Sequence, residues 1–542
     1  MNMKHYFNYI QEVVAKNWDA PALSDFEGTI SYTYGELTTQ ICKLKILFEQ
    51  LGIEHHDKIA ICGKNSSNWG ISFLSTIAYK AVAVSILPDF TEESIQYLIE
   101  HSESKVLFVC PWVLHRIDIT KLRHLEAIIN IEDFELIYCK NSIEQSVLND
   151  RFNRLYPNFD ESILSNLSSI FPTDNMDELA LINYTSGSTG SPKGVMVTHK
   201  NLASNVIFGQ DNIPNHPGLT LVSMLPLAHM FGMMFEFLYQ MAGGTHVYFI
   251  TKNLTPSILM KAFGAVHPYM ILTVPLVVEK IFKKKIFPII NKPLIKMLWY
   301  TPGINQVIRR KVYNQLMESF GGKLKFLIIG GAALNEEVER CMKQIHFPYT
   351  CGYGMTECAP LLCYAKWNEF EFKSCGRIID RMEIRVDSND PTSTPGEIQV
   401  RGANVMLGYY KNPEATNSAF TKDGWLRTGD IGIIDQKNNV FLRGRCKNMI
   451  LGPSGQNIYP EEIEDKLNSL DGIVECVVVE RKGLLVGLVY PEDLTNREEF
   501  AKATLDKVNK LLPAYARLGS IEIVEKEFEK TPKKSIKRFL YS

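Results

Sequence analysis

Paired cysteines are absent from the sequence. Its 11 cysteines are scattered from Cys42 to Cys476, and none belongs to a Cys-x-x-Cys unit. Such a set in a long chain is typical of reduced thiols and argues against a disulfide framework or a zinc site. We therefore expect a protein of a cytoplasmic compartment.

A surplus of positive charge is also missing. The 58 Lys and Arg residues stand against 60 Asp and Glu residues, which gives a formal net charge of -2 at pH 7. Proteins dedicated to nucleic acids generally carry a basic excess, because phosphate contacts dominate their affinity. The composition therefore excludes a dedicated nucleic-acid partner.

Long apolar runs are the third absence. Residues 1–8 lack the apolar stretch of a signal peptide, and the most apolar window, Ile71 to Pro88, is interrupted by Lys80. That window is too short for a spanning helix and is expected to be buried core. With 45% hydrophobic residues over 542 positions, the chain instead predicts a globular protein of roughly three to four domain-sized units.

Strand-like and helix-like segments alternate along most of the chain. Apolar runs at 58–62, 105–110, 179–184 and 324–329 read as strands, and 69–84 reads as a buried helix. This alternation predicts an α/β fold with mainly parallel, helix-covered sheets. From Gly396 onward the elements become shorter: strands at 397–401, 440–443, 476–479 and 485–490, and a helix at 460–470.

The strongest local motif is the glycine loop, Tyr184-Thr-Ser-Gly-Ser-Thr-Gly-Ser-Pro-Lys-Gly194. Its glycines allow backbone N–H groups to converge on an anion, and its hydroxyls and Lys193 add donors for phosphate. It is not a Walker A motif, because Gly194 stands where that motif has Ser or Thr. A plain surface turn is the alternative, but the preceding strand and the lysine favour phosphate binding. The predicted phosphate-binding residues are Thr185, Ser186, Gly187, Ser188, Thr189, Gly190 and Lys193.

A second glycine segment, Cys351-Gly-Tyr-Gly-Met-Thr-Glu357, does not complete the dinucleotide-binding pattern, because Glu357 replaces its third glycine. Gly352 and Gly354 would let a flat ligand approach the backbone closely. The carboxylate of Glu357 suits Mg²⁺, which prefers oxygen ligands. Ordinary packing of a turn explains this segment equally well when it is taken alone.

Taken in order, these segments and several others resemble the adenylate-forming superfamily, which includes acyl-CoA synthetases, luciferases and peptide-synthetase adenylation domains. The resemblance covers nearly the whole chain. Within the superfamily, residues 267–281 are most similar to the long-chain fatty acyl-CoA synthetases. The further matching motifs are Tyr32-Thr-Tyr-Gly-Glu-Leu37, Leu225-Pro-Leu-Ala-His-Met-Phe-Gly232, Gly396-Glu-Ile-Gln-Val-Arg-Gly402, Gly408-Tyr-Tyr410, Thr428-Gly-Asp430, Gly444-Arg-Cys-Lys447 and Asn457-Ile-Tyr-Pro-Glu-Glu462.

The resemblance implies a large N-terminal domain of layered, helix-covered sheets with a small distorted barrel, followed by a small mobile α+β C-terminal domain. We place these domains at 1–445 and 446–542, with Lys447 as the hinge. The implied reaction has two steps: a carboxylate attacks the α-phosphate of ATP·Mg²⁺, and the thiol of coenzyme A then displaces AMP. ATP, Mg²⁺ and coenzyme A are accordingly the expected cofactor and co-substrates.

The same resemblance assigns roles to single residues. Thr185 and Glu357 would lie near the metal, and Lys193 beside the β- and γ-phosphates. Asp430 would accept hydrogen bonds from the ribose hydroxyls, and Arg445 would reach the ribose or the phosphate. His229 would lie near the acyl carboxylate, with a core histidine as the alternative. Gly331, Ala332 and the backbone of Gly352 and Tyr353 would form the adenine slot. The remaining implied nucleotide-binding residues are Gly354, Met355 and Thr356.

The C-terminal segment Lys530-Thr-Pro-Lys-Lys-Ser-Ile-Lys-Arg538 departs from the family pattern. Ser535 occupies the place of the family lysine that contacts the α-phosphate, and a hydroxyl does not supply that positive charge. We expect Lys534 to act instead, from one position earlier. The alternatives are a slow adenylation step or an enzyme that favours the thioester-forming step.

The acid substrate is expected to be a medium- or long-chain fatty acid, held by the apolar stretch 230–235 unless that stretch is ordinary core. Three alternatives remain: transfer to an acyl-carrier protein, an aryl-acid substrate, and a noncatalytic adenylate-binding protein. The segment 280–311 mixes basic and apolar residues. It predicts either a peripheral contact with a lipid surface or a carrier protein, or a solvated helix face with a buried stripe.

Overall fold

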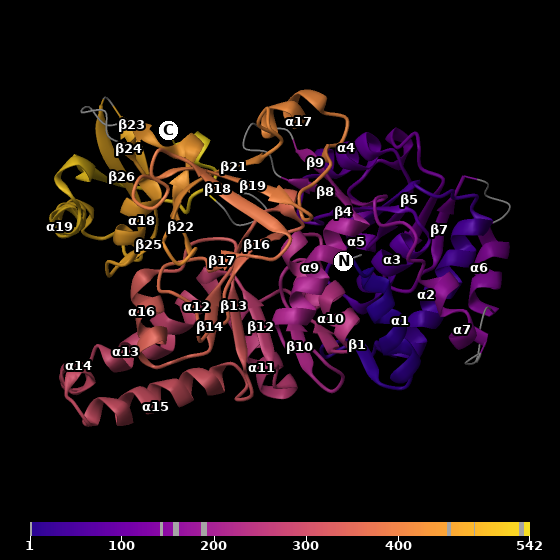
Figure 1. Cartoon of the computed structure of the whole chain (residues 1–542), viewed down its shortest axis with the longest axis horizontal. Helices are drawn as coiled ribbons and strands as arrows, with labels where there is room; N and C mark the ends of the chain where they lie inside the picture. The colour runs from indigo at the N-terminus through magenta and orange to yellow at the C-terminus, as the bar shows by residue number, and fades with distance from the viewer. Residues whose placement is uncertain are drawn as a thin grey trace.

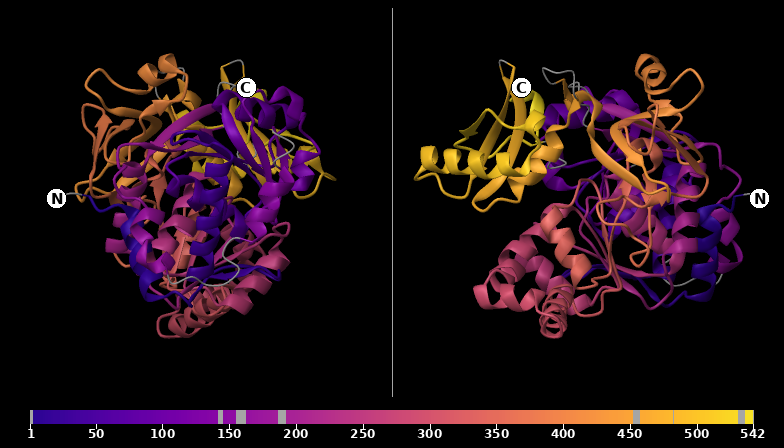
Figure 2. Two further views of the ribbon diagram at one scale, coloured as in Figure 1. Left: turned by 90° about the vertical axis from the view of Figure 1, so that its right-hand side faces the viewer. Right: turned by 60° about the vertical axis from the view of Figure 1, so that its left-hand side comes forward.

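The computed structural model describes residues 3–140, 145–154, 162–185, 192–451, 457–481, 483–530 and 536–541. Most of the chain forms a broad body, and the C-terminal residues form a smaller unit at one end of it (Figure 1). A view turned by 60° separates this unit from the sheets and helices of the body (Figure 2).

An eight-stranded sheet forms the core of the N-terminal part. Its central strands are parallel and almost entirely buried, as expected where helices cover a sheet. The strand order is β20 (Gly408–Tyr409), β9 (Lys193–Thr198), β8 (Leu179–Thr185), β4 (Val82–Ile86), β3 (Lys58–Cys62), β5 (Ser104–Val109), β6 (Ala127–Asn130) and β7 (Leu136–Cys139).

The sequence predicted one helix over 69–84, but the structure forms two elements there. Helix α3 covers Ser67–Ala78, with Ser66 as its N-cap, and the chain then turns into the strand β4. Lys80, in the left-handed region at a φ of 63°, lies in the turn between the two elements. Both elements are fully buried, so the apolar pattern alone did not separate them.

A seven-stranded sheet lies beside the first and contains the second set of parallel strands. Its order is β14 (Tyr349–Cys351), β13 (Phe326–Ile329), β12 (Met270–Thr273), β10 (Thr220–Ser223), β11 (His246–Phe249), β1 (Pro21–Asp25) and β2 (Ser31–Thr33). Strands β13 and β14 are parallel neighbours, with Ile329 opposite Cys351. The segments that follow these strands, Gly330-Gly-Ala332 and Gly352-Tyr-Gly354, therefore emerge side by side.

Two smaller sheets occupy the region where we expected a small barrel. They comprise β15 (Tyr353–Gly354), β16 (Leu361–Tyr364) and β17 (Arg377–Ile378), and then β18 (Met382–Asp387), β19 (Gly396–Gly402), β21 (Leu426–Ile434) and β22 (Val440–Arg445). The C-terminal unit follows, with β23 (Ile450–Leu451) and β24 (Asn457–Ile458), and a sheet of β25 (Ile473–Arg481), β26 (Leu484–Pro491) and β27 (Ser520–Ile523).

Helices cover these sheets and several begin at capping residues. Thr33 and Glu36, for example, form a reciprocal capping box at the start of α2. The helices are α1 (Tyr6–Lys16), α2 (Tyr34–Gln50), α4 (Glu92–Ser102), α5 (Pro111–Leu114), α6 (Gln145–Arg154), α7 (Ser162–Ser165), α8 (Leu167–Ile170), α9 (His199–Asn212), α10 (Tyr239–Gly243), α11 (Pro256–Val266), α12 (Pro275–Ile281), α13 (Phe287–Ile290), α14 (Pro293–Tyr300), α15 (Ile304–Ser319), α16 (Glu336–Gln344), α17 (Pro413–Ala419), α18 (Pro460–Asn468) and α19 (Arg497–Leu511). Shorter 3₁₀ or π turns cover Ile119–Lys121, Gly232–Leu238, Phe282–Ile286, Thr356–Cys358, Cys446–Asn448, Ala514–Ala516 and Arg538–Leu540.

Candidate functional site

Asp430 lies at the centre of a cluster formed by three strands. Its strand β21 pairs with β22 so that Asp430 is opposite Arg445, whose Nη1 lies 2.7 Å from Asp430 Oδ1. From β15, the Tyr353 hydroxyl donates a hydrogen bond to Asp430 Oδ2 at 2.6 Å. The structure thus brings together three residues that the sequence assigned to nucleotide binding.

The environment of Asp430 keeps its carboxylate in place while leaving acceptor capacity. Its side chain is only 13% exposed, whereas that of Arg445 is 47% exposed. Burial raises the pKa of Asp430, and Arg445 and the Tyr353 hydroxyl oppose that shift. A carboxylate has about four lone-pair sites, so two bound donors leave room for two more. Those free sites suit a pair of ligand hydroxyls.

The turn before Asp430 explains why the motif is Thr-Gly-Asp. Thr428 is buried, its hydroxyl donates to Ile398 O at 2.8 Å, and it accepts the backbone N–H of Asp430 at 3.1 Å. Gly429 has a φ of 69°, in the left-handed region that favours glycine. Thr428 and Gly429 therefore set the position from which the Asp430 carboxylate projects.

A second cluster contains Glu357, Tyr409 and Lys193. The Tyr409 hydroxyl donates to Glu357 Oε1 at 2.9 Å, and Lys193 Nζ lies 5.1 Å from the centre of the Tyr409 ring. Strand β20 pairs with β9, which places Tyr409 opposite Val195, two residues after the lysine. Sequence reasoning assigned no role to Tyr409, although its motif Gly408-Tyr-Tyr410 was visible.

Thr185 and Lys193 frame the glycine loop from both sides. Thr185 ends β8 and Lys193 begins β9, and the two are paired across this antiparallel ladder. The Thr185 hydroxyl donates to the backbone carbonyl of Lys193 at 3.4 Å. The loop residues Ser186, Gly187, Ser188, Thr189 and Gly190 lie outside the described residues.

The oxygen atoms of Thr185 and Glu357 suit a magnesium ion by their chemistry. Strand β9, the ladder partner of Thr185, packs against the turn Thr356–Cys358 that carries Glu357. Within the described ranges, no group of three or more His, Cys, Asp or Glu side chains could hold a metal by itself. Mg²⁺ beside a nucleotide usually takes only one or two carboxylates and completes its shell with phosphate and water, so this sparse donor set fits it.

The predicted adenine-binding segments meet at the carboxyl ends of β13 and β14, an edge where α/β sheets commonly bind ligands. Gly331 has a φ of 89°, and both Gly331 and Ala332 are exposed. Gly352 donates its N–H to Ile329 O at 2.9 Å. At Gly354, a Cβ atom would lie 2.2 Å from Pro360 O, so only glycine allows this close approach. Met355 and Thr356 follow on the same segment, just before Glu357.

His229 lies in the loop between β10 and the π turn Gly232–Leu238. Asn183, near the end of β8, donates to the adjacent Ala228 O at 2.8 Å, which ties this loop to the strand that leads into the glycine loop. His229 itself is partly exposed. The apolar stretch after it is core-like, since Met230, Met233, Met234 and Phe235 are at most 3% exposed.

A buried carboxylate that the sequence analysis did not single out supports the His229 loop. Glu236 is fully buried, and its Oε2 accepts hydrogen bonds from Ser223 Oγ at 2.9 Å, Met224 N at 3.0 Å and Leu225 N at 2.9 Å. Burial raises the pKa of Glu236 to about 8, and these three donors oppose the rise. A sequence signal existed, because Glu236 is an acid within an otherwise apolar run.

Lys534 and its neighbours 531–535 lie outside the described residues, but both flanks are anchored. Lys530 Nζ lies 2.7 Å from Glu475 Oε2, and Arg538 pairs with the buried Glu464. Lys530 and Ile536 form an antiparallel bridge. Burial raises the pKa of Glu464 to about 7, opposed mainly by Arg538. These contacts anchor Lys530 to β25 and Arg538 to α18 on either side of the segment.

Lys447, which we expected to be the hinge, lies in the turn Cys446–Asn448, directly after β22 and its Arg445. It is exposed, and the next strand is the short β23.

Among the described helices, none has the length and apolarity that crossing a membrane requires.

Family profiles match most of the chain. The profile of the AMP-binding enzyme matches residues 10–410, and that of the AMP-binding enzyme C-terminal domain matches residues 462–534. Among curated relatives, 4-coumarate–CoA ligase 4 of Arabidopsis thaliana is 26% identical over 91% of this chain and 83% of its own. Long-chain-fatty-acid–CoA ligase 4 of Saccharomyces cerevisiae is 31% identical over 58% of this chain and 48% of its own. The long-chain-fatty-acid–CoA ligase of Escherichia coli is 26% identical over 86% of this chain and 82% of its own.

Solved structures share the fold. ATP-bound MatB from Rhodopseudomonas palustris has a TM-score of 0.76 and 22% identity, with 98% of each chain covered. The anthranilate CoA ligase AuaEII in complex with anthranoyl-AMP has a TM-score of 0.80 and 17% identity, covering all of this chain and 97% of that one. These likenesses confirm the expected α/β fold, with a large N-terminal and a small C-terminal domain.

Proposed function

The chain belongs to the AMP-binding enzyme family, and on that premise we propose that it is an ATP-dependent acid–CoA ligase that activates a medium- or long-chain fatty acid. In the first step, a carboxylate oxygen of the acid bonds to the α-phosphorus of ATP, and the bond to the bridging oxygen breaks to release pyrophosphate. In the second step, the sulfur of coenzyme A bonds to the acyl carbon, and AMP leaves with the electrons of the broken C–O bond.

The observation that carries this proposal is the position of Asp430 between Tyr353 and Arg445. A largely buried carboxylate with two unused acceptor sites suits the two hydroxyls of a ribose. The glycine segments after β13 and β14 emerge beside one another, and in this proposal they hold the adenine. Nucleotide recognition therefore accounts for the cluster of Asp430, Tyr353 and Arg445, which the strands β21, β15 and β22 bring together.

The chain's own groups act mainly by positioning and by neutralising charge, as phosphoryl transfer requires. Lys193 would bind the β- and γ-phosphates, and Lys534 would offset charge that develops on the α-phosphate. Thr185 and Glu357 would hold Mg²⁺, which when bound supplies further neutralisation of the phosphates. Tyr409 would orient the Glu357 carboxylate through its 2.9 Å hydrogen bond.

The fatty acid as substrate is supported by the names of several relatives, which include long-chain-fatty-acid–CoA ligases of yeast and Escherichia coli. The apolar stretch after His229 is compatible with it, since its methionine side chains are flexible enough to adapt to an acyl chain. His229 would lie near the acid's carboxylate. We further propose that residues 1–445 and 446–542 move relative to each other about Lys447 between the two steps.

An aryl acid is the second candidate substrate. The 4-coumarate–CoA ligase 4 of Arabidopsis thaliana is similar to 91% of the present chain. Transfer to an acyl-carrier thiol is a further alternative, since such carriers present the same reacting arm as coenzyme A. A noncatalytic adenylate-binding protein is the alternative of another class, suggested by Ser535 in place of the family lysine.

Pyrophosphate release tests these options when it is measured over a panel of acids, with and without coenzyme A. We expect release with decanoate or hexadecanoate and formation of the corresponding thioester only when coenzyme A is present. Faster turnover with 4-coumarate or benzoate would identify an aryl-acid ligase. Release without thioester formation would indicate another acceptor, and no release with any acid would favour the noncatalytic protein.

A further inference from the structure

We propose that the helical hairpin α14–α15 docks the protein on an anionic lipid bilayer. The proposal rests on the surface of this hairpin and is independent of the proposed ligase activity. The hairpin projects from the edge of the body, at the lower left of Figure 1, away from β21, the strand that carries Asp430. Its two helices, Pro293–Tyr300 and Ile304–Ser319, are joined by a three-residue turn.

The tip of the hairpin exposes large apolar side chains on both sides of that turn. Within fourteen consecutive residues, five such side chains are exposed by 46% to 70%: Leu294, Met297, Tyr300, Ile304 and Val307. Elsewhere in the described chain, large apolar side chains of comparable exposure occur singly or in pairs, such as Leu511 with Tyr515 and Phe539 with Leu540. For the segment 280–311 we expected either a docking surface or a solvated helix face with a buried stripe. The second expectation does not explain why large apolar side chains also occupy the solvent-exposed face.

The inner face of the hairpin accounts for its attachment to the body. Trp299 is 4% exposed and donates its Nε1–H to Gln344 Oε1 of α16 at 2.8 Å. Val312 and Leu316 of α15 are buried in the same core cluster. Gly303, with a φ of 83°, permits the turn between the helices. The exposed apolar residues are thus surplus to the packing that holds the hairpin in place.

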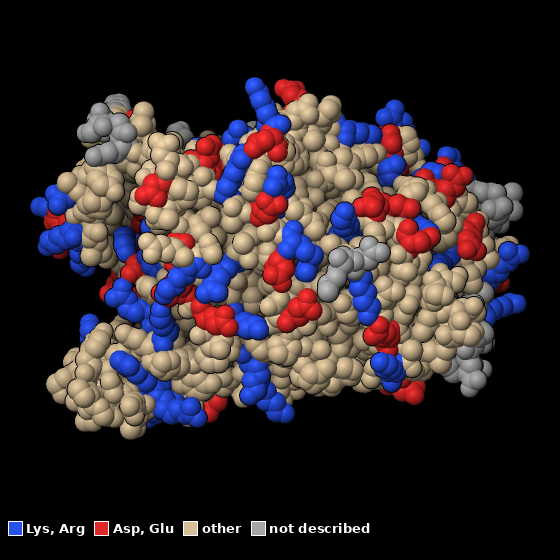
Figure 3. Space-filling model, in the orientation of Figure 1, with Lys and Arg blue, Asp and Glu red and all other residues tan. Residues whose placement is uncertain are grey.

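The charge of this region complements an anionic surface. Between Glu279 and Glu318 the sequence has nine Lys or Arg residues and no Asp or Glu, although the whole chain carries a net charge of -2. Lys283 and Lys285 are engaged within the protein, with Ile473 O at 3.2 Å and Ser319 Oγ at 3.4 Å respectively. The exposed basic residues around the tip are Lys292, Lys296, Arg310 and Lys311. Figure 3 shows this end of the molecule as a broad uncharged surface edged by basic side chains.

These two properties together favour a bilayer over a carrier protein. Apolar side chains at a projecting tip can enter the acyl boundary of a membrane, while flanking lysines and arginines bind anionic headgroups. An acidic carrier protein would be recognised by the basic residues alone and would leave the apolar tip unexplained. On α15, Ile304, Val307 and Lys311 follow an i, i+3, i+7 spacing, so one helix face combines both kinds of contact.

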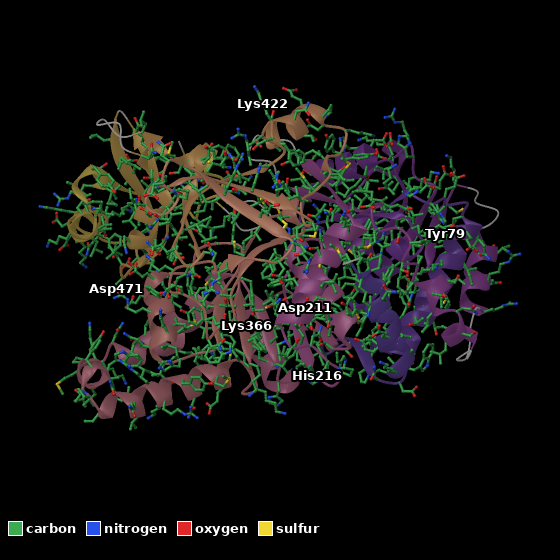
Figure 4. All side chains as sticks on the ribbon, viewed as in Figure 1. Tyr79, Asp211, His216, Lys366, Lys422 and Asp471 are labelled. Atoms are coloured by element: carbon green, nitrogen blue, oxygen red, sulfur yellow. The ribbon has the colours of Figure 1, made fainter. Side chains whose placement is uncertain are left out.

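Vesicle flotation with the full-length protein tests the proposal. One variant carries Met297→Ser, Tyr300→Ser and Val307→Ser, and a second carries Lys292→Glu, Lys296→Glu and Lys311→Glu. The control carries Lys422→Glu, Lys437→Glu and Lys502→Glu, which changes the net charge equally on other exposed surfaces. Lys422 lies at the opposite edge of the molecule, near α17 (Figure 4).

We expect the wild type and the control to float with vesicles of phosphatidylcholine and phosphatidylglycerol but not with phosphatidylcholine alone. Each hairpin variant should bind at least about tenfold more weakly, because both insertion and charge contribute. Circular dichroism of the variants checks that they are folded. Equal flotation of all four proteins would overturn the proposal, as would no flotation of the wild type. Binding to an acidic carrier protein in place of vesicles, lost in the charge variant, would also overturn it.

Discussion

The Tyr353 hydroxyl donates a 2.6 Å hydrogen bond to the Asp430 carboxylate, although the two residues are 77 positions apart in the chain. This contact links the glycine segment after β14 to the Thr-Gly-Asp turn of β21. Burial raises the pKa of the Tyr353 hydroxyl far above its usual range, and the neighbouring Asp430 raises it further, so the phenol stays a donor at neutral pH. The pair therefore connects the predicted adenine-binding and ribose-binding parts of the site.

Replacing the Asp430 carboxylate should weaken nucleotide binding. In Asp430→Asn, one acceptor oxygen becomes a donor, and charge-assisted bonds to the ribose hydroxyls are lost. We expect the KM for ATP to rise about ten- to a hundredfold, as the loss of one or two such bonds predicts. Steady-state kinetics with varied ATP checks this. An unchanged KM for ATP and an unchanged affinity for AMP by calorimetry would contradict the role of Asp430.

Neutralising Glu357 should raise the requirement for magnesium. Glu357→Gln keeps the size of the side chain and the contact with Tyr409, but it removes the negative charge that a hard cation prefers. We expect about a tenfold higher Mg²⁺ concentration at half-maximal pyrophosphate release, which corresponds to about 1.4 kcal/mol of binding free energy. Glu414→Gln, at an exposed position of α17, is the matched control. Identical Mg²⁺ titrations of the two variants would remove Glu357 from the metal site.

Lys534 should be needed for the first step only. Lys534→Ala removes a cation that would offset charge on the transferring phosphoryl group, so pyrophosphate release should fall about a hundredfold. Conversion of synthetic acyl-AMP and coenzyme A to the thioester should keep its wild-type rate. Lys533→Ala serves as the control for the loss of one positive charge in this segment. Unchanged pyrophosphate release in Lys534→Ala would show that another group replaces the family lysine.

Glu236 should make the stability of the protein fall as the pH rises through neutrality. Its folded pKa of about 8 lies above the ordinary value of 4.5, so between these two values the folded protein holds a proton that the unfolded chain has lost. The free energy of unfolding therefore decreases with rising pH in this window, by at most about 1.4 kcal/mol per pH unit from this group.

Glu236→Gln can keep an oxygen acceptor for the Ser223, Met224 and Leu225 donors without titrating. We expect its melting temperature to fall less than that of the wild type between pH 5 and pH 8. Parallel melting curves against pH would contradict the raised pKa. Glu236→Ala should be less stable than either at pH 5, by about 1–3 kcal/mol for each donor left without its acceptor.

Much of the fold could be predicted, because short apolar strands that alternate with helical segments leave a clear pattern. The strands predicted at 58–62 and 105–110 correspond to β3 and β5, and that at 179–184 corresponds to β8. The prediction of one helix over 69–84 was wrong after Ala78, because a buried helix and a buried parallel strand are both continuously apolar.

Contacts between distant segments could not be predicted from the residues alone. Tyr409 reaches Glu357 only because β20 adds to the edge of the sheet that contains Lys193. Glu236 interacts with the end of β10 only because the chain folds back through the π turn. Local patterns identify the groups that can bind a nucleotide, whereas strand pairing decides which of those groups meet.

The most direct test of the proposed function is a single reaction that contains ATP, Mg²⁺, hexadecanoate and coenzyme A, with the products identified by mass spectrometry. The proposal predicts AMP, pyrophosphate and hexadecanoyl-CoA in equal amounts, and hexadecanoyl-AMP when coenzyme A is left out. The formation of ADP and phosphate, or the absence of any acyl-adenylate with every acid of the panel, would contradict it.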